Sequence, residues 1–209
     1  MDAQTFLFVI EMIGTIAAAI SGIRMAAARN FDWFGAYSVG LVTAIGGGTL
    51  RDMLLGIPVF WMQSWWYILV TFFSLGTVIL FKHILVHTRI LFVFDTVGLA
   101  LFVVIGIQKS LAVDYAMWVA ITMGIVTGAT GGVARDILLN HEPLLFKKDF
   151  YATACLMGGL IYWIVMLCGA SMPVCGMMCA ATVIIARLLA VHYSWHLPQL
   201  HADSSDNDE

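Results

Sequence analysis

Two segments of the sequence place consecutive glycines beside an Arg-Asp pair within a long apolar stretch. The first runs from Gly46 to Asp52 (G-G-G-T-L-R-D) and the second from Gly128 to Asp136 (G-A-T-G-G-V-A-R-D). A glycine in a helix interior costs about 1 kcal/mol relative to alanine. Three in a row therefore indicate a break in the helix, where main-chain carbonyl oxygens are released and can replace part of the hydration shell of a cation.

We predict that both helices are broken at these glycines and that the breaks line an ion or substrate pathway. The alternative is close helix packing through small residues, for which Gly40, Ala44 and Gly48 have the required four-residue spacing. Threonine hydroxyls beside the glycines add further oxygen ligands. The candidate pathway residues are Thr43, Gly46, Gly47, Gly48 and Thr49 in the first segment and Thr127, Thr130, Gly131 and Gly132 in the second.

Each glycine segment has a carboxylate on the apolar stretch that precedes it, Glu11 for the first and Asp95 for the second. Ionisable residues inside membrane helices are costly, face the bundle interior and mark pathways. A rise of 1.5 Å per residue places Glu11 about 9 Å and Arg51 about 6 Å below the same membrane edge. The alternative role is an ion pair that holds helices together without ion passage. The predicted clusters are Glu11, Arg51 and Asp52 on the outer side and Asp95, Arg135 and Asp136 on the inner side.

The elements that position these residues are membrane-spanning helices. The chain of 209 residues is 61% hydrophobic and only 11% charged, and its mean hydropathy is +0.93. Soluble domains carry about a quarter charged residues, so the composition predicts an all-α integral membrane protein. The ten Lys and Arg residues form no basic patch, which argues against a nucleic-acid partner. The seven predicted spans are 5–23, 34–55, 65–81, 90–107, 115–139, 150–168 and 174–193.

The first half of the sequence matches the second at an offset of 84 residues. Because each copy contains three helices, the second must enter the membrane from the opposite side, which predicts an inverted repeat followed by a seventh helix. The predicted units are 1–83, 84–170, the seventh helix at 171–195 and an acidic disordered tail at 196–209. The matched pairs include Glu11 with Asp95, Gly14 with Gly98, Gly22 with Gly106, Gly40 with Gly124, Thr43 with Thr127, Gly47 and Gly48 with Gly131 and Gly132, and Arg51-Asp52 with Arg135-Asp136.

Basic residues gather on one side of the predicted spans, which places the N-terminus outside and the C-terminus in the cytoplasm. We expect Arg187, near the end of the last span, to extend to the cytoplasmic headgroups. The four cysteines are expected to be free thiols, with a Cys168–Cys175 disulfide as the alternative. The loops on the basic side contain Arg24, Arg29, Lys82, Arg89, Lys147 and Lys148, and the opposite loops contain Lys109.

The duplicated three-helix units, the seventh helix and the paired motifs G-G-G-T-L-R-D and G-G-V-A-R-D resemble the prokaryotic branch of the trimeric intracellular cation (TRIC) channels, which overlaps proteins labelled as glycine transporters. The resemblance spans about residues 5–193. It implies a homotrimer with one pore per protomer in the inner (plasma) membrane of a bacterium or archaeon. It also implies pore-lining breaks at Gly46 to Gly48 and at Gly131 and Gly132, the second less complete because Thr130 matches Gly46.

The resemblance implies a monovalent cation channel, with potassium or sodium as the permeant ion. The resemblance implies no cofactor, no resident metal and membrane lipids as partners, and no motif of an enzyme is present. The alternative is a secondary transporter of a small zwitterion such as glycine, since broken helices suit both classes. A third class is a helix-packing scaffold without transport. Unitary potassium currents would favour the channel, and glycine uptake without such currents would favour the carrier.

Overall fold

The computed structural model describes residues 3–81, 88–143, 145 and 151–194, and the predicted tail at 196–209 lies outside them. The described residues contain α-helices and one short 3-10 turn but no strand, so the predicted all-α fold is confirmed. The elements in chain order are α1 (Ala3–Ala27), α2 (Trp33–Leu55), η1 (Phe60–Met62), α3 (Trp66–Leu80), α5 (Thr88–Ala112), α6 (Met117–Leu138), α7 (Tyr151–Leu167) and α8 (Met172–His192).

The ends of α2 show why the sequence starts and stops a helix at these points. Asp32 caps its N-terminus, because the carboxylate accepts a hydrogen bond of 2.7 Å from the main-chain N–H of Gly35. Gly56 ends it with a positive φ of 67°, a conformation that glycine adopts without steric cost. The helix therefore covers the predicted span from 34 to 55 and positions Arg51 and Asp52 in its last turn.

Four of the described helices, α1, α5, α6 and α8, are long and apolar enough to cross a membrane. Helices α3 and α7 are apolar but have 15 and 17 residues, which correspond to about 22 and 25 Å, less than the hydrocarbon thickness of about 30 Å. Helix α2 is long enough but is not apolar enough to be counted with these four helices. Its glycines, its hydroxyl residues and the Arg-Asp pair lower its mean hydropathy. The protein is a multi-pass membrane protein, as its composition predicts.

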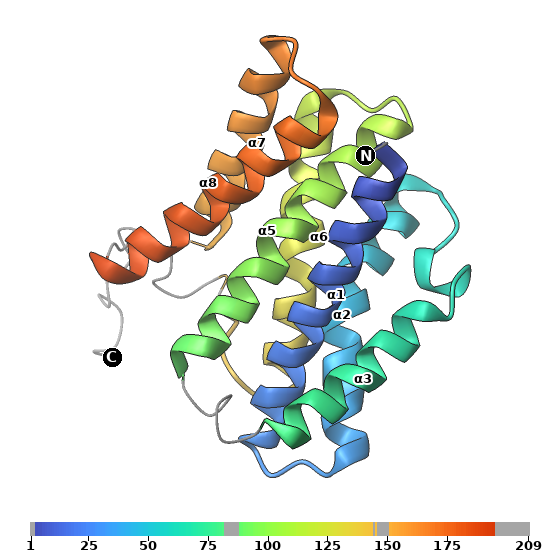
Figure 1. Cartoon of the computed structure of the whole chain (residues 1–209), viewed down its shortest axis with the longest axis vertical. Helices are drawn as coiled ribbons and strands as arrows, with labels where there is room; N and C mark the ends of the chain where they lie inside the picture. Colours follow the sequence, from blue (N-terminus) through green and yellow to red (C-terminus); the bar gives the residue numbers. More distant parts are fainter. Residues whose placement is uncertain (1–2, 82–87, 144, 146–150, 195–209) are drawn as a thin grey trace, which may run out of the picture.

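Equivalent helices of the two predicted units make equivalent contacts. Helix α1 packs against α2 and α3, α5 packs against α6, and α1 also packs against α5. Helices α1 and α5 run in opposite directions, and α7 and α8 form a pair beside α5, away from α3 (Figure 1). Helices α2 and α6 contact each other at the centre of the bundle. The inverted placement of the two units in a membrane stays a prediction.

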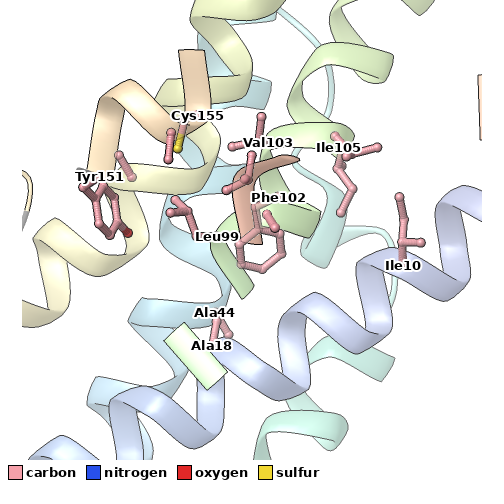
Figure 2. Close-up of a cluster of buried hydrophobic side chains, with 14 of the residues drawn as sticks. Ile10, Ala18, Ala44, Leu99, Phe102, Val103, Ile105, Tyr151 and Cys155 are labelled. Carbon is pink, nitrogen blue, oxygen red and sulfur yellow. The ribbon is translucent and has the colours of Figure 1, made fainter. Parts of the chain in front are cut away.

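The buried core lies where helices of both predicted units and α7 meet. Leu99, Phe102 and Val103 of α5 lie between the aliphatic residues of α1 and the start of α7, where Tyr151 and Cys155 are buried (Figure 2). The four cysteines are free thiols, as expected, although Cys168 is exposed at the end of α7 rather than buried. The core also includes Ala44 of α2 and Ala129 of α6.

The predicted helix breaks are wrong for this structure. Helix α2 continues through Gly46, Gly47 and Gly48, and α6 continues through Gly131 and Gly132, so these glycines release no main-chain carbonyls. Gly47 and Gly131 instead allow close packing, because a Cβ atom at Gly47 would overlap the carbonyl oxygen of Thr127 and one at Gly131 would overlap the carbonyl oxygen of Thr43. Small residues let helix backbones touch, which is the alternative that the four-residue spacing indicates.

Candidate functional site

The centre of the candidate site is the crossing of α2 and α6, which contains the predicted pathway residues. The hydroxyls of Thr43 and Thr127 are buried there and donate to the carbonyl oxygens of Val39 (2.6 Å) and Met123 (2.5 Å) in their own helices. The crossing is closed by backbone contact at its glycines. Thr49 and Thr130 lie on the same helices and donate in the same way to Ile45 (2.7 Å) and Val126 (2.7 Å).

A small cavity of about 10 Å³ lies beside the crossing, which is space for about one water molecule. Its polar lining comes from Asp95, Thr43 and Tyr151, and its other walls include Gly128 and Gly132 of α6. The cavity therefore joins the crossing to the carboxylate of the second predicted charge cluster.

The first charge cluster contains Glu11, Arg51, Asp52 and Lys109, and is called the Glu11 cluster below. Arg51 Nε donates to Asp52 Oδ1 at 2.7 Å, and Arg51 Nη2 lies 2.7 Å from the same oxygen and 4.0 Å from Glu11 Oε1. The geometry of neither Nη2 contact is that of a hydrogen bond, so among the described residues this buried nitrogen has an ion-pair partner, Asp52, but no hydrogen-bond acceptor. Lys109 Nζ donates to Glu11 Oε1 at 2.9 Å, and the Tyr67 hydroxyl donates to Glu11 Oε2 at 2.8 Å.

Phe60 of η1 contacts three members of the Glu11 cluster. Its ring lies 5.5 Å from the guanidinium of Arg51 and 5.1 Å from the ammonium of Lys109, distances at which a cation is attracted to a ring. Its main-chain N–H donates to Asp52 Oδ2 at 2.9 Å. The ring also contacts Tyr67 edge-on and packs on Gly48, where a side chain would collide with it.

The second charge cluster contains Asp95, Arg135, Asp136 and Arg187, and is called the Asp95 cluster below. Arg135 Nη1 donates to Asp95 Oδ1 at 2.6 Å and to the Ser21 hydroxyl at 2.8 Å, and its Nε donates to Asp136 Oδ1 at 2.9 Å. Arg187 Nη1 donates to Asp95 Oδ2 at 2.8 Å. Among the described residues, each cluster therefore contains two carboxylates and two cations, whose formal charges cancel.

The two clusters lie on opposite sides of the α2–α6 crossing. Arg51 follows Gly47 by four residues, Arg135 follows Gly131 by four residues, and the two helices belong to units whose first helices run in opposite directions. On α1, Glu11 and Ser21 contact different clusters and are ten residues apart, which is about 15 Å along the helix. The structure thus brings together the residues predicted for each cluster.

Sequence reasoning missed residues that complete the clusters. Tyr67 and Tyr151 could have been found, because the 84-residue offset aligns them and both lie at a cluster. Lys109 and Arg187 have no such signal. The expectation that Arg187 extends to the headgroups is wrong: its side chain is 2% exposed and lies 4.6 Å from the Tyr151 ring and 4.9 Å from the Phe92 ring. Pairing with Asp95 holds it inside the bundle.

Replacing Tyr67 with phenylalanine is expected to destabilise the protein by about 2 kcal/mol, because Glu11 is buried and a hydrogen bond to a charged group contributes about 1.5–3 kcal/mol. This corresponds to a decrease in Tm of roughly 4–8 °C. Tyr37→Phe is the matched control, since the Tyr37 hydroxyl makes a long contact of 3.4 Å to the carbonyl of Ile68 on the exposed side. Thermal unfolding in detergent tests both variants, and equal Tm values for both would contradict the assigned role of Tyr67.

The fold and the paired charge clusters define a multi-pass α-helical membrane protein. It is built from two similar units and one additional helix, α8, which packs against α7. The family model described as "Glycine transporter" matches residues 8–83 and 92–167, two segments that are themselves 84 residues apart. The chain belongs to this family. It is 37% identical to a UPF0126 membrane protein of Vibrio cholerae, over 94% of this chain and 85% of that protein. It is 34% identical to the UPF0126 inner membrane protein YadS of Escherichia coli K12, over 94% and 97%.

A solved structure described as the TRIC trimeric intracellular cation channel orthologue from Rhodobacter sphaeroides is similar in fold. The TM-score is 0.86 at 29% sequence identity, and the match covers 91% of this chain and 100% of that chain. The resemblance to prokaryotic TRIC channels and to the glycine transporter family is confirmed. These relatives are described as membrane proteins and this similar structure as a channel.

Proposed function

We propose that the protein is a potassium-permeable cation channel, a homotrimer with one pore in each protomer. One observation carries the proposal: nearly the whole chain superposes on a channel described as trimeric and cation-conducting, at 29% identity and a TM-score of 0.86. The family model matches the two units at residues 8–83 and 92–167, and the fold match covers 91% of the chain, so helices and charge clusters that would form a pore are part of the similarity.

The proposed ion path follows the α2–α6 crossing between the Glu11 cluster and the Asp95 cluster. In the described conformation the crossing is closed, and the neighbouring cavity of about 10 Å³ has space for about one water. Conduction therefore requires the two helices to separate or bend. The consecutive glycines from Gly46 to Gly48 support this step, because glycine gives up helical geometry at lower cost than any residue with a side chain. The threonine and glycine residues predicted for the pathway would face the opened crossing.

The proposed orientation places the N-terminus outside and the C-terminus in the cytoplasm of a bacterial or archaeal inner membrane. Arg24 and Arg29 lie at the end of α1 that would face the cytoplasm, and Lys109 lies at the opposite end of the bundle. Lys82, Lys147 and Lys148, which the prediction also used, lie outside the described residues. Apolar side chains on α1, including Phe8 and Ile13, are about half exposed and would contact membrane lipids or a second protomer of the trimer.

A glycine carrier is the second candidate, and the description of the matching family model favours it. In a carrier, Arg51 or Arg135 would bind the substrate carboxylate. Both guanidiniums are already paired with aspartates in this conformation, so a substrate carboxylate would have to displace one of them. The channel proposal needs no such exchange.

Purified protein in a planar bilayer distinguishes these functions. A channel is expected to give unitary currents whose reversal potential follows an imposed KCl gradient toward the potassium equilibrium potential. The second measurement is glycine uptake into liposomes that contain the purified protein. Glycine accumulation without unitary currents would contradict the channel and support the carrier, and the absence of both activities would contradict both proposals.

A further inference from the structure

The two charge clusters differ in the exposure of one cation. The side chain of Lys109 is 22% exposed, whereas the side chain of Arg187, its counterpart in the Asp95 cluster, is 2% exposed. Arg51 and Arg135 are each 1% exposed. Among the described cations of the two clusters, Lys109 is therefore the most exposed.

Lys109 also stands outside the internal duplication. The 84-residue offset aligns it with Met25, which has no charge, and Arg187 belongs to α8 rather than to either unit. Lys109 extends from α5 in the second unit to Glu11 on α1 in the first unit. The Glu11 cluster thus depends on a contact between the units that the duplication did not supply.

The charge balance of the Glu11 cluster depends on this lysine. Without it, the nearest cation to Glu11 is Arg51, whose Nη2 is 4.0 Å from Glu11 and 2.7 Å from Asp52. One guanidinium would then face two carboxylates, and the cluster would change from neutral to a formal charge of −1. A carboxylate at a pore entrance raises the local concentration of cations, and an ammonium beside it cancels that effect.

We propose that Lys109 limits cation entry at the end of the pore that carries the Glu11 cluster, by neutralising Glu11. The inference rests on the proposed channel function and assigns a specificity-determining residue to it. Removing the lysine charge increases cation current that enters from this end and leaves current from the Asp95 end less changed. At low salt the expected increase is about twofold to threefold, and it disappears near 1 M salt, because the Debye length falls from about 30 Å at 0.01 M to about 3 Å.

The test replaces Lys109 with cysteine in a Cys168→Ser background, since the other three native cysteines are buried. Single-channel currents are measured in symmetric KCl at low and high concentration, with reagent on the Glu11 side. A positively charged trimethylammonium-ethyl thiosulfonate is expected to restore the currents of the background protein. A negatively charged sulfonatoethyl thiosulfonate is expected to increase entry from that side further. Lys109→Arg keeps the charge and is expected to conduct like the unmodified protein.

Each outcome of this experiment decides a separate point. If the unmodified protein carries no potassium current, the proposed channel function fails. If it conducts, but the cysteine variant conducts equally before and after either reagent, Lys109 does not limit entry and this inference fails. A change that is the same from both sides and at all salt concentrations also overturns it, because a packing defect has no sidedness and is not screened by salt. Size-exclusion profiles identify any variant that does not fold, and Lys109→Gln then provides a second neutral variant.

Discussion

Gly47→Ala is expected to prevent formation of the folded protein, whereas Gly46→Ala is expected to leave it folded. A methyl group at Gly47 would overlap the carbonyl oxygen of Thr127 in α6, a main-chain atom that cannot rotate away. At Gly46 the nearest atoms to an added Cβ are 3.9 Å and 4.0 Å away. Both changes raise helix propensity by about 1 kcal/mol, so the difference between them isolates the contact with α6.

The measurement is the yield of monodisperse protein after extraction in detergent, followed by thermal unfolding. Gly131→Ala is expected to behave like Gly47→Ala, because its methyl group would overlap the carbonyl oxygen of Thr43. Gly76→Ala on α3 is a further control, since an added Cβ there meets nothing within 4 Å. Equal yields for Gly46→Ala and Gly47→Ala would mean that the α2–α6 contact is not needed for folding.

Arg135→Gln is expected to destabilise the protein by about 3–5 kcal/mol, because it removes one partner of a buried ion-pair network and leaves two buried carboxylates with less compensating positive charge. Arg135 is 1% exposed and joins Asp95, Asp136 and Ser21 through three helices. Unfolding in detergent measures the effect. Arg29→Gln serves as the control, since the exposed Arg29 side chain donates from Nε to His141 Nε2 at 3.0 Å and the loss of this surface contact is expected to cost under about 1 kcal/mol.

A second variant separates charge from packing in this prediction. Arg135→Gln combined with Asp136→Asn removes one of the two carboxylates that Arg135 binds and keeps the pair between Asp95 and Arg187, so it is expected to recover part of the lost stability. Recovery would show that the uncompensated charge is the cause. A double variant that is less stable than Arg135→Gln by the full cost of a second independent change would contradict the assigned ion pair.

The membership of the charge clusters was largely predictable because the sequence is duplicated. The same offset pairs Glu11 with Asp95 and Arg51 with Arg135, and each set meets in the structure. Tyr67 and Tyr151 were available from the same offset but lie at the start of apolar helices, where tyrosine is also an ordinary interfacial residue. Lys109 and Arg187 were not predictable, since each occurs once and reaches its cluster from a helix that only the tertiary fold brings close.

The helix breaks show where local preference is an insufficient guide. Low helix propensity predicts both an unwound segment and a close crossing, because glycine permits each for the same reason, the missing Cβ. Whether the glycine segment unwinds or forms a close crossing depends on whether another helix packs against it. Here α6 lies against α2 at Gly47 and the backbone contact stabilises the continuous helix. Gly40 and Gly124, which pack against Ile23 and Ile107 in the same manner, follow the same principle.

The central claim of this account is that ions pass between α2 and α6, and one measurement tests it most directly. Gly46→Cys introduces a thiol at the crossing, where an added Cβ atom would lie 3.9 Å from the Cα atom of Gly131 and meet nothing closer. Silver ions bind thiolates, so Ag⁺ is expected to block potassium current through this variant within the recording, while the unsubstituted protein with its four native cysteines shows the background. A thiol assay first establishes that the introduced cysteine has reacted with Ag⁺. If the potassium current is then undiminished, the ion path lies elsewhere and the account is contradicted.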